Sequence, residues 1–337
     1  QPLPCWDHTW WPFKIERRAW AGGFRLTGLT VLAAGRRAGL MRIHIENLGA
    51  EERSVPIRCE VAGTLDRHQE WFFRPPVSST ACAVEIDRST LVLRQDASAI
   101  VISHVESTMC WQSGSPVVGQ AEVLIPGGAT LDITLVFAIG PVEAARSDCR
   151  ALAADPEATL VAADDRHRAQ VTRLQDLLPR LSSSNPALDQ WYHRSLVHLI
   201  LNRWEVPEFV VNPYYGTGSI RGGCICCYVW NYGEIWEILP LVDPVANRAH
   251  IIQTLRSGMT SHLAWNPVDG RGGGPWYPVN QEKIVGLVYF QVRNGGDRAF
   301  LDEMVDGRNV LDHVLDHALS GDDLGRPVDL IDYGPAN

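Results

Sequence analysis

Three acidic residues occupy positions that suit acid–base chemistry on a glycosidic bond. Glu234 lies one turn into a predicted helix, Glu282 opens another predicted helix, and Asp332 lies in an Asp-Tyr-Gly loop. Cleavage of such a bond by water uses two carboxyl groups, of which one protonates the leaving oxygen while the other activates water or attacks the sugar. We therefore predict that the catalytic residues are among Glu234, Glu282 and Asp332.

Each of these acids also has a structural interpretation. Glu234 could satisfy backbone donors in a buried first turn, Glu282 could belong to an N-terminal cap beside Asn280, and Asp332 could order a turn. A helix N-terminus lowers the pKa of a carboxyl group and favours a base, whereas burial against tryptophan raises it and favours an acid. The residues alone leave the assignment of acid and base open.

Aromatic residues gather in short polar and glycine-rich stretches. The chain has 12 Trp, and the stretches 213–216 (Pro-Tyr-Tyr-Gly) and 275–278 (Pro-Trp-Tyr-Pro) lie between predicted helices. Sugars present flat C–H faces that stack on aromatic rings, although bulky aromatic side chains also anchor loops to a core. We predict that the sugar subsites are formed by Tyr214, Tyr215, Trp230, Trp276 and Tyr277.

Arg221, Asn231 and Tyr333 complete the predicted substrate-binding residues. A guanidinium fork suits a uronate carboxylate, so Arg221 favours an acidic glycan if it lines the site. The same residues, with Tyr215, also fit a polysaccharide lyase, in which Tyr or His abstracts the C5 proton of a uronate while Arg or Asn neutralises its carboxylate. Elimination by a lyase is therefore an alternative to hydrolysis.

The charge and hydropathy of the chain argue against nucleic acid and membrane as partners. The 337 residues carry 39 acidic and 30 basic side chains, a net charge of -9, which argues against a nucleic-acid binder. No apolar run reaches the roughly 18 residues that span a bilayer, so we expect a soluble protein and no membrane partner. The first residues lack a starting Met and a leader pattern, so we expect a trimmed chain whose compartment stays open between cytoplasm, periplasm and exterior.

Cysteine spacing predicts neither a metal centre nor a disulfide framework. Eight Cys are spread irregularly, and Cys224 and Cys227 form a single C-x-x-C with no second pair at a suitable distance. Buried thiols are the simpler interpretation. We predict no metal and no cofactor, and an oligosaccharide or polysaccharide as the partner. The sequence indicates no oligomeric state.

The first part of the chain has the pattern of an antiparallel β-sandwich. Most of its apolar segments alternate with period two, and Gly, Pro and Asp separate them every 8–15 residues. Many short strands of this kind indicate a sandwich rather than a parallel sheet. The predicted strands are residues 43–47, 55–61, 82–86, 90–93, 100–102, 121–125 and 131–137.

The pattern becomes helical near Val142. Residues 142–152 and 156–178 form a predicted linker, and the predicted helices that follow are 186–205, 230–241, 244–259, 281–293 and 297–319. Helices that are apolar all round alternate with amphipathic ones, as concentric inner and outer rings require. We therefore predict three parts: a β-sandwich over 1–141, a helical linker over 142–184, and over 185–337 the first part of an α/α toroid whose remainder is absent.

Short motifs lie in residues 214–218, 221–223, 228–231, 239–244 and 294–301. They resemble those of the six-hairpin glycosidase superfamily, which includes glucoamylases, trehalases, processing α-glucosidases, amylo-α-1,6-glucosidases and disaccharide phosphorylases. Some of its members also carry an N-terminal β-sandwich and a helical linker. The resemblance implies a glycoside hydrolase, expected to be inverting, with a phosphorylase as a further alternative.

The sequence departs from the family pattern at one position. Relatives carry Trp-Asp at the start of an inner helix, where the Asp often binds sugar or serves as the acid, whereas this chain has Trp230 followed by Asn231. An amide can bind a hydroxyl group but cannot donate a proton as a general acid. The family role of that position therefore transfers to Asn231 only as sugar binding.

Overall fold

The computed structural model describes residues 7–62, 65, 82–87, 89–105, 109–217, 226–258, 261–274, 277 and 279–319. The described residues up to Gln170 form one compact unit, and those from Val171 onward form a second. The predicted boundaries at 141 and 184 stay a prediction.

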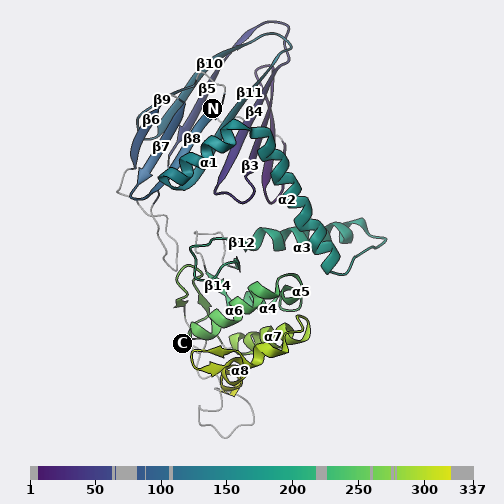
Figure 1. The fold of residues 1–337 in the computed structure, drawn as a ribbon. Coiled ribbons are helices and arrows are strands. Elements are labelled where there is room, and N and C mark those ends of the chain that lie inside the picture. The colour runs from purple at the N-terminus through teal and green to yellow at the C-terminus, as the bar shows by residue number, and fades with distance from the viewer. Residues whose placement is uncertain are drawn as a thin grey trace. The chain divides into compact units, whose positions relative to one another are not determined.

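The first unit contains two antiparallel sheets (Figure 1). The larger has the strand order β1-β2-β3-β4-β11-β8-β7-β6, and the smaller has the order β5-β10-β9. The strands are β1 (Asp7–Trp10), β2 (Lys14–Ala21), β3 (Phe24–Leu32), β4 (Ala38–Asn47), β5 (Arg53–Val61), β6 (Ala83–Asp87), β7 (Thr90–Gln95), β8 (Ser98–Val105), β9 (Cys110–Gln112), β10 (Val117–Ile125) and β11 (Thr130–Pro141).

At β7 both faces of the larger sheet are packed, and period two decides which side chain faces which layer. On β7, Leu91 and Leu93 pack in the layer between the two sheets with Trp111 of β9. Val92, between them, points to the opposite face and packs with Cys149 of the helix α1 (Val142–Ala154). The predicted sandwich is therefore confirmed, and α1 packs against its sheet within the first unit (Figure 1).

Every strand predicted from the sequence is present, in β4 to β8, β10 and β11. The hairpin of β2 and β3 was not predicted. Its turn is Gly22-Gly23, and both glycines have positive φ angles of 56° and 82°. A two-residue turn with this conformation matches the right-handed twist of a hairpin, and glycine adopts it without strain.

The second unit is mainly helical. The helix α2 (Pro156–Leu177) crosses from the first unit into it. The following helices are α3 (Pro186–Asn202), α4 (Val229–Gly233), α5 (Leu239–Val242), α6 (Pro244–Arg256), α7 (Val279–Arg293), the 3-10 helix η1 (Arg298–Asp302) and α8 (Val310–Leu319). Short strands lie between them. Two pairs are β12 (Arg203–Trp204) with β13 (Tyr214–Tyr215) and β17 (Met304–Val305) with β18 (Arg308–Asn309). A three-stranded sheet has β15 (Ala264–Trp265) between β14 (Cys227–Tyr228) and β16 (Gly272–Gly273).

Local sequence signals fix the helix starts. Asn185 caps α3, because its side chain accepts a hydrogen bond from the Ala187 nitrogen at 3.0 Å, and Pro186 follows at the first helical position. Asp243 caps α6 in the same way, accepting from Ala246 at 3.1 Å. Proline suits the first turn because its missing N–H would have no partner there.

Two segments that were each predicted as one continuous helix are interrupted in the structure. The segment 230–241 is two short helices, α4 and α5, because Pro240 lacks an N–H and its ring would clash within a continuous helix. The segment 297–319 is η1, the β17–β18 hairpin and α8. The hairpin turn is Asp306-Gly307, and both residues have positive φ angles, 47° and 85°. This pair is a strong hairpin signal.

The order of contacts shows that α4 and α7 run in the same direction. Trp230 contacts Tyr277, which precedes α7, at a ring-centroid distance of 5.3 Å, and Trp236, beyond the end of α4, contacts Phe290 near the end of α7 at 5.6 Å. Between them, a Cβ on Gly233 would meet the side chain of Lys283. The two helices therefore begin at the same rim of the second unit.

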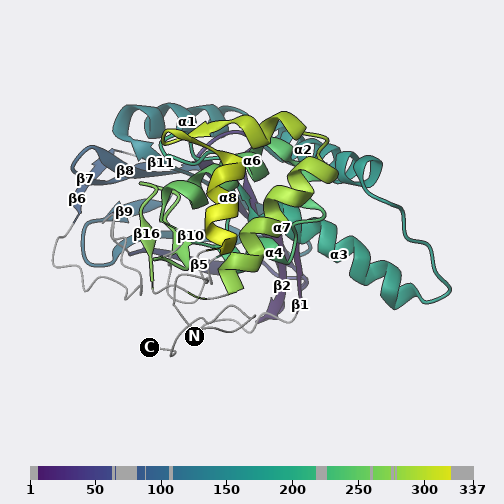
Figure 2. The same ribbon diagram turned by 90° about the horizontal axis from the view of Figure 1, so that it is seen from below.

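The helices α6 and α8 both pack against α7 (Figure 2), and their contacts show that they run the other way. Asn247, near the start of α6, donates to Gln291, near the end of α7, at 2.8 Å. Gln281, in the first turn of α7, donates at 2.9 Å to the carbonyl of His317, near the end of α8. Parallel helices separated by antiparallel ones are the arrangement predicted for the first hairpins of an α/α toroid.

Candidate functional site

Three aromatic rings meet at the rim where α4 and α7 begin. Tyr228 and Trp230 are stacked, with centroids 5.2 Å apart and planes 6° from parallel. Tyr277 lies against Trp230 at 59° and has 43% of its surface exposed. The indole nitrogen of Trp230 donates to the side-chain oxygen of Asn231 at 3.1 Å. We call Tyr228, Trp230 and Tyr277 the rim aromatic cluster.

Local structure holds this cluster in place. Tyr228 ends β14, which pairs with β15 in the register Tyr228 to Ala264. The Tyr228 nitrogen donates to the Thr217 hydroxyl at 2.6 Å, so a second loop is tied to the same strand. Trp230 then lies in the first turn of α4. A short sheet and a helix start therefore fix the two stacked rings.

The predicted acids Glu234 and Glu282 lie beside the packed pair of α4 and α7. Glu234 follows Gly233 and is exposed. Glu282 precedes Lys283, is 68% exposed, and lies 3.6 Å from the Lys283 ammonium group. Because α4 and α7 are parallel and packed together, Glu234 and Glu282 belong to the same pair of helices. Both carboxylates are open to solvent.

The predicted subsite residues Tyr214 and Tyr215 lie elsewhere. They are only 2% and 4% exposed, and both belong to the hydrophobic core of the second unit. Burial raises the pKa of both phenols. Neither ring offers a face to a sugar, so the structure gives these two residues a role in packing.

Tyr215 belongs to a buried polar network beneath the rim. Its hydroxyl donates to Asp243 at 3.4 Å, and the Arg203 guanidinium donates to the same carboxylate oxygen at 2.7 Å. Burial lowers the pKa of Arg203, but its hydrogen bonds to Asp243 and Glu205 raise it above its ordinary value overall. The network joins β12, β13 and the cap of α6.

His250 of α6 continues this network and is fully buried. Its Nε2 accepts a hydrogen bond from the Tyr215 nitrogen at 3.1 Å, and its ring stacks on Tyr232 at 4.4 Å. Burial lowers the pKa of His250 to about 3, although Asp243 acts in the opposite direction. The residue is therefore a neutral structural histidine, which accepts through Nε2.

We expect His250 to make the unfolding free energy depend on pH. Between about pH 6.5 and about pH 3 the unfolded chain binds a proton here that the folded chain does not. Stability therefore falls as the pH is lowered through this window, by at most about 1.4 kcal/mol per pH unit. Urea unfolding at several pH values should show the His250→Gln variant losing this contribution. The exposed His198→Gln variant is the control, and an unchanged pH slope in His250→Gln would contradict the prediction.

Four predicted site residues, Arg221, Trp276, Asp332 and Tyr333, lie outside the described residues. Within the described ranges, no group of three or more His, Cys, Asp or Glu could hold a metal ion. No helix in that part of the chain is long and apolar enough to cross a membrane.

The sequence reasoning missed Tyr228 and the pair of Arg203 with Asp243. Tyr228 stands two residues before Trp230, in a motif that was singled out, so its neighbourhood was a usable signal. Arg203 and Asp243 are 40 residues apart, and nothing local connects them.

No family model and no curated relative matches the sequence. Solved structures do match. A putative kojibiose phosphorylase from the human microbiome has a TM-score of 0.60 at 9% identity, over 86% of this chain and 42% of its own. A bacterial glucoamylase complexed with acarbose has a TM-score of 0.53 at 11% identity, over 83% of this chain and 45% of its own.

The likeness confirms the fold that the sequence motifs predicted. The chain is a two-part α and β protein, with an antiparallel β-sandwich followed by toroid helices, similar in fold to carbohydrate-processing enzymes. At this level of identity the likeness concerns the fold alone. The chain spans less than half the length of either matched structure.

Proposed function

We propose that the protein is a glycoside hydrolase that cleaves an oligosaccharide or polysaccharide with paired carboxylates and inversion at the anomeric carbon. The observation that carries this proposal is the rim aromatic cluster, which lies at the start of the parallel helices α4 and α7. Glu282 lies in the first turn of α7, and Glu234 directly follows the last residue of α4. The exposed ring of Tyr277, with the partly buried rings of Tyr228 and Trp230, suits a substrate that presents apolar C–H faces.

The roles of the residues follow from their chemistry. Glu234, Glu282 and Asp332 are the candidates for the acid and the base, which in an inverting enzyme are about 6.5–9.5 Å apart to admit water. The Asn231 amide, which accepts from Trp230, keeps its own N–H groups for a sugar hydroxyl. Arg221, Trp276 and Tyr333 remain proposed substrate contacts.

A phosphorylase is the second candidate. It is favoured by the fold likeness to a structure described as a putative kojibiose phosphorylase, whose TM-score is higher than that of the glucoamylase described above. In that reaction, phosphate replaces water as the nucleophile, so one carboxylate suffices as the acid. Hydrolysis and phosphorolysis therefore differ in the nucleophile, which is water or phosphate. They also differ in whether the protein supplies side chains that contact phosphate.

The test is product analysis with the full-length protein. A panel of neutral and uronate-containing oligosaccharides is incubated with and without inorganic phosphate, and the products are followed by NMR and mass spectrometry. A free sugar in both conditions, with the inverted anomer seen first, supports the proposal. A sugar phosphate formed only with phosphate assigns a phosphorylase, and an unsaturated product absorbing near 232 nm assigns a lyase.

Trp230→Ala is expected to raise KM about tenfold with a smaller change in kcat, because an aromatic contact contributes about 0.5–1.5 kcal/mol beyond its buried area. The measurement is steady-state kinetics on the substrate identified above. Trp191→Ala is the matched control, since Trp191 is a 66% exposed tryptophan on α3. Equal effects of the two variants would argue against a sugar subsite at Trp230.

A further inference from the structure

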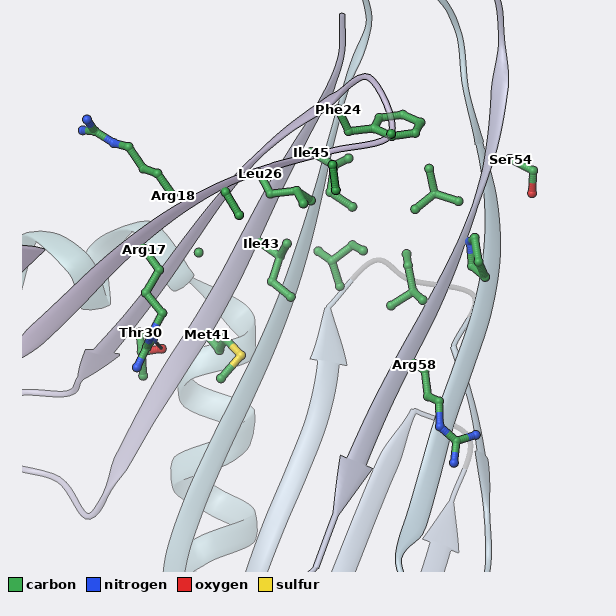
Figure 3. A pocket seen from close by; sticks show the side chains of 18 residues that line it. Arg17, Arg18, Phe24, Leu26, Thr30, Met41, Ile43, Ile45, Ser54 and Arg58 are labelled. Atoms are coloured by element: carbon green, nitrogen blue, oxygen red, sulfur yellow. Dashed lines mark hydrogen bonds between the residues drawn. The ribbon is translucent and has the colours of Figure 1, made fainter. Parts of the chain in front are cut away.

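The first unit contains a groove that the proposed activity does not use. It has a volume of about 680 Å³ and lies between the larger sheet and β5 (Figure 3). The larger sheet contributes side chains such as Phe24, Leu26, Ile43 and Ile45, and β5 contributes Val55 and Ile57. The walls are therefore mainly aliphatic, which suits a hydrocarbon better than a sugar.

The groove is open because the smaller sheet ends at β5. The described strands of that sheet have the order β5-β10-β9, whereas the larger sheet continues through β4, β3, β2 and β1. Pro56 stands within β5, and the pairing with β10 runs without a break from Arg53 to Val61. A proline within an unbulged strand is found where its nitrogen faces an open edge. Pro56 thus removes a donor that an added strand would need, which disfavours closure by strand pairing.

Gly28 leaves space at the floor of the groove. It lies in β3, opposite Arg17 of β2 and Ile43 of β4, and a Cβ built on it would meet no atom within 4 Å. Glycine inside a strand weakens it and often marks a place where a ligand or another backbone approaches. The free volume is thus partly a consequence of this one residue.

The charged side chains of the groove all have one sign. Arg17, Arg18 and Arg58 line it, and no Asp or Glu does. Arg18 is paired with Glu16 and Arg58 with Glu60, each at 2.7 Å. Arg17 instead donates to the Thr30 hydroxyl at 3.3 Å, and no carboxylate of the described residues pairs with it. The guanidinium of Arg17 is thus available for an anion at the mouth of the groove (Figure 3).

We propose that this groove binds the free carboxylate form of a fatty acid with an alkyl chain of about the length of dodecanoate. The alkyl chain lies between the two sheets, over Gly28, and the carboxylate pairs with Arg17. Charge complementarity selects this occupant, because a cationic rim above aliphatic walls matches an anion with a hydrocarbon tail. The proposal is independent of the catalytic reaction assigned to the second unit.

The test is calorimetric titration of the full-length protein with dodecanoate below its micelle concentration, with dodecanol as the uncharged comparison. Wild type is expected to bind dodecanoate more tightly than dodecanol. Arg17→Gln should weaken dodecanoate about tenfold and leave dodecanol unchanged. Arg36→Gln, at an exposed arginine paired with Asp148, is the control and should change neither.

Gly28→Leu should abolish binding of both ligands because its side chain fills the groove, and circular dichroism should show an unchanged fold. Gly28→Ala is the smaller replacement if leucine impairs folding, and it should weaken binding of both ligands. Absence of dodecanoate binding to wild type, or binding unchanged by Gly28→Leu and Gly28→Ala, overturns the proposal. Sedimentation that shows a dimer lost in Gly28→Leu would assign the groove to a second copy of the chain instead.

Discussion

Asp243→Ala is expected to destabilise the second unit by about 3–5 kcal/mol, because removal of one partner of a buried ion pair leaves the other charge without compensation. Arg203 donates to this carboxylate at 2.7 Å, and the Asp243 side chain is only 9% exposed. The substitution also removes the cap of α6 and the acceptor for Tyr215. Urea unfolding, followed by circular dichroism and by tryptophan fluorescence, measures the change.

Two control variants separate charge from hydrogen bonding. Asp243→Asn keeps an oxygen for the cap and is expected to lose less stability than Asp243→Ala. Asp176→Ala removes an exposed carboxylate of α2 that pairs with Arg180, four residues further along the chain. Such an exposed pair is expected to contribute at most about 0.5 kcal/mol. A loss below 1 kcal/mol for Asp243→Ala would show that the pair is solvated in solution and that the network contributes little to the stability of the second unit.

The sandwich could be predicted because each of its strands carries its own local signal. In β7, alternate residues face different layers, so period two was visible before any partner was known. The β2–β3 hairpin was missed although Gly22-Gly23 is a recognised turn pair. Strand β2 contains Lys14, Glu16, Arg17 and Arg18, and this charge hides its alternation.

The helical region shows where local signals mislead. Apolar residues continue from 230 to 241, but Pro240 breaks the helix, and backbone chemistry prevails over hydrophobic pattern there. The Asp306-Gly307 turn likewise interrupts a segment with helical spacing. Pro240 and Asp306-Gly307 are both residues that interrupt helices, so the sequence itself contains the signal against a continuous helix in each segment.

The candidate site could be predicted only in part. Trp230 was identified from its motif, but its contact with Tyr277 joins residues 47 positions apart, and periodicity carries no information on such pairs. Tyr214 and Tyr215 have the same aromatic and glycine-rich neighbourhood as Tyr277, yet they are buried. Residue type and loop composition do not determine exposure, which depends on the helices packed around the loop.

The buried network includes a residue of α4. Tyr232, in α4 two residues after Trp230, donates to the carbonyl of Tyr215 at 2.6 Å. The Tyr215 nitrogen in turn donates to His250, so α4, β13 and α6 are connected through one residue. In the proposed hydrolase, a first turn of α4 held in this way would orient Trp230 and Asn231 before substrate binds and so lower the entropy cost of binding.

Replacement of the catalytic acid by its amide should reduce kcat by about 10²–10⁴-fold, the range for a positioned general acid or base, with little change in KM. The variants are Glu234→Gln, Glu282→Gln and Asp332→Asn. Glu237→Gln is the matched control, since Glu237 is a neighbouring exposed carboxylate whose backbone carbonyl accepts from Asn294.

The pH profile then separates the roles. Loss of the acid should remove the limb of the kcat/KM profile at high pH, and loss of the base should remove the limb at low pH, because each limb reports the ionisation of one group. A substrate with an activated leaving group should restore turnover to the acid variant but not to the base variant, since it departs without protonation. If all three variants keep the activity of Glu237→Gln, the acid and the base are other residues, and the rim of α4 and α7 serves to hold the sugar.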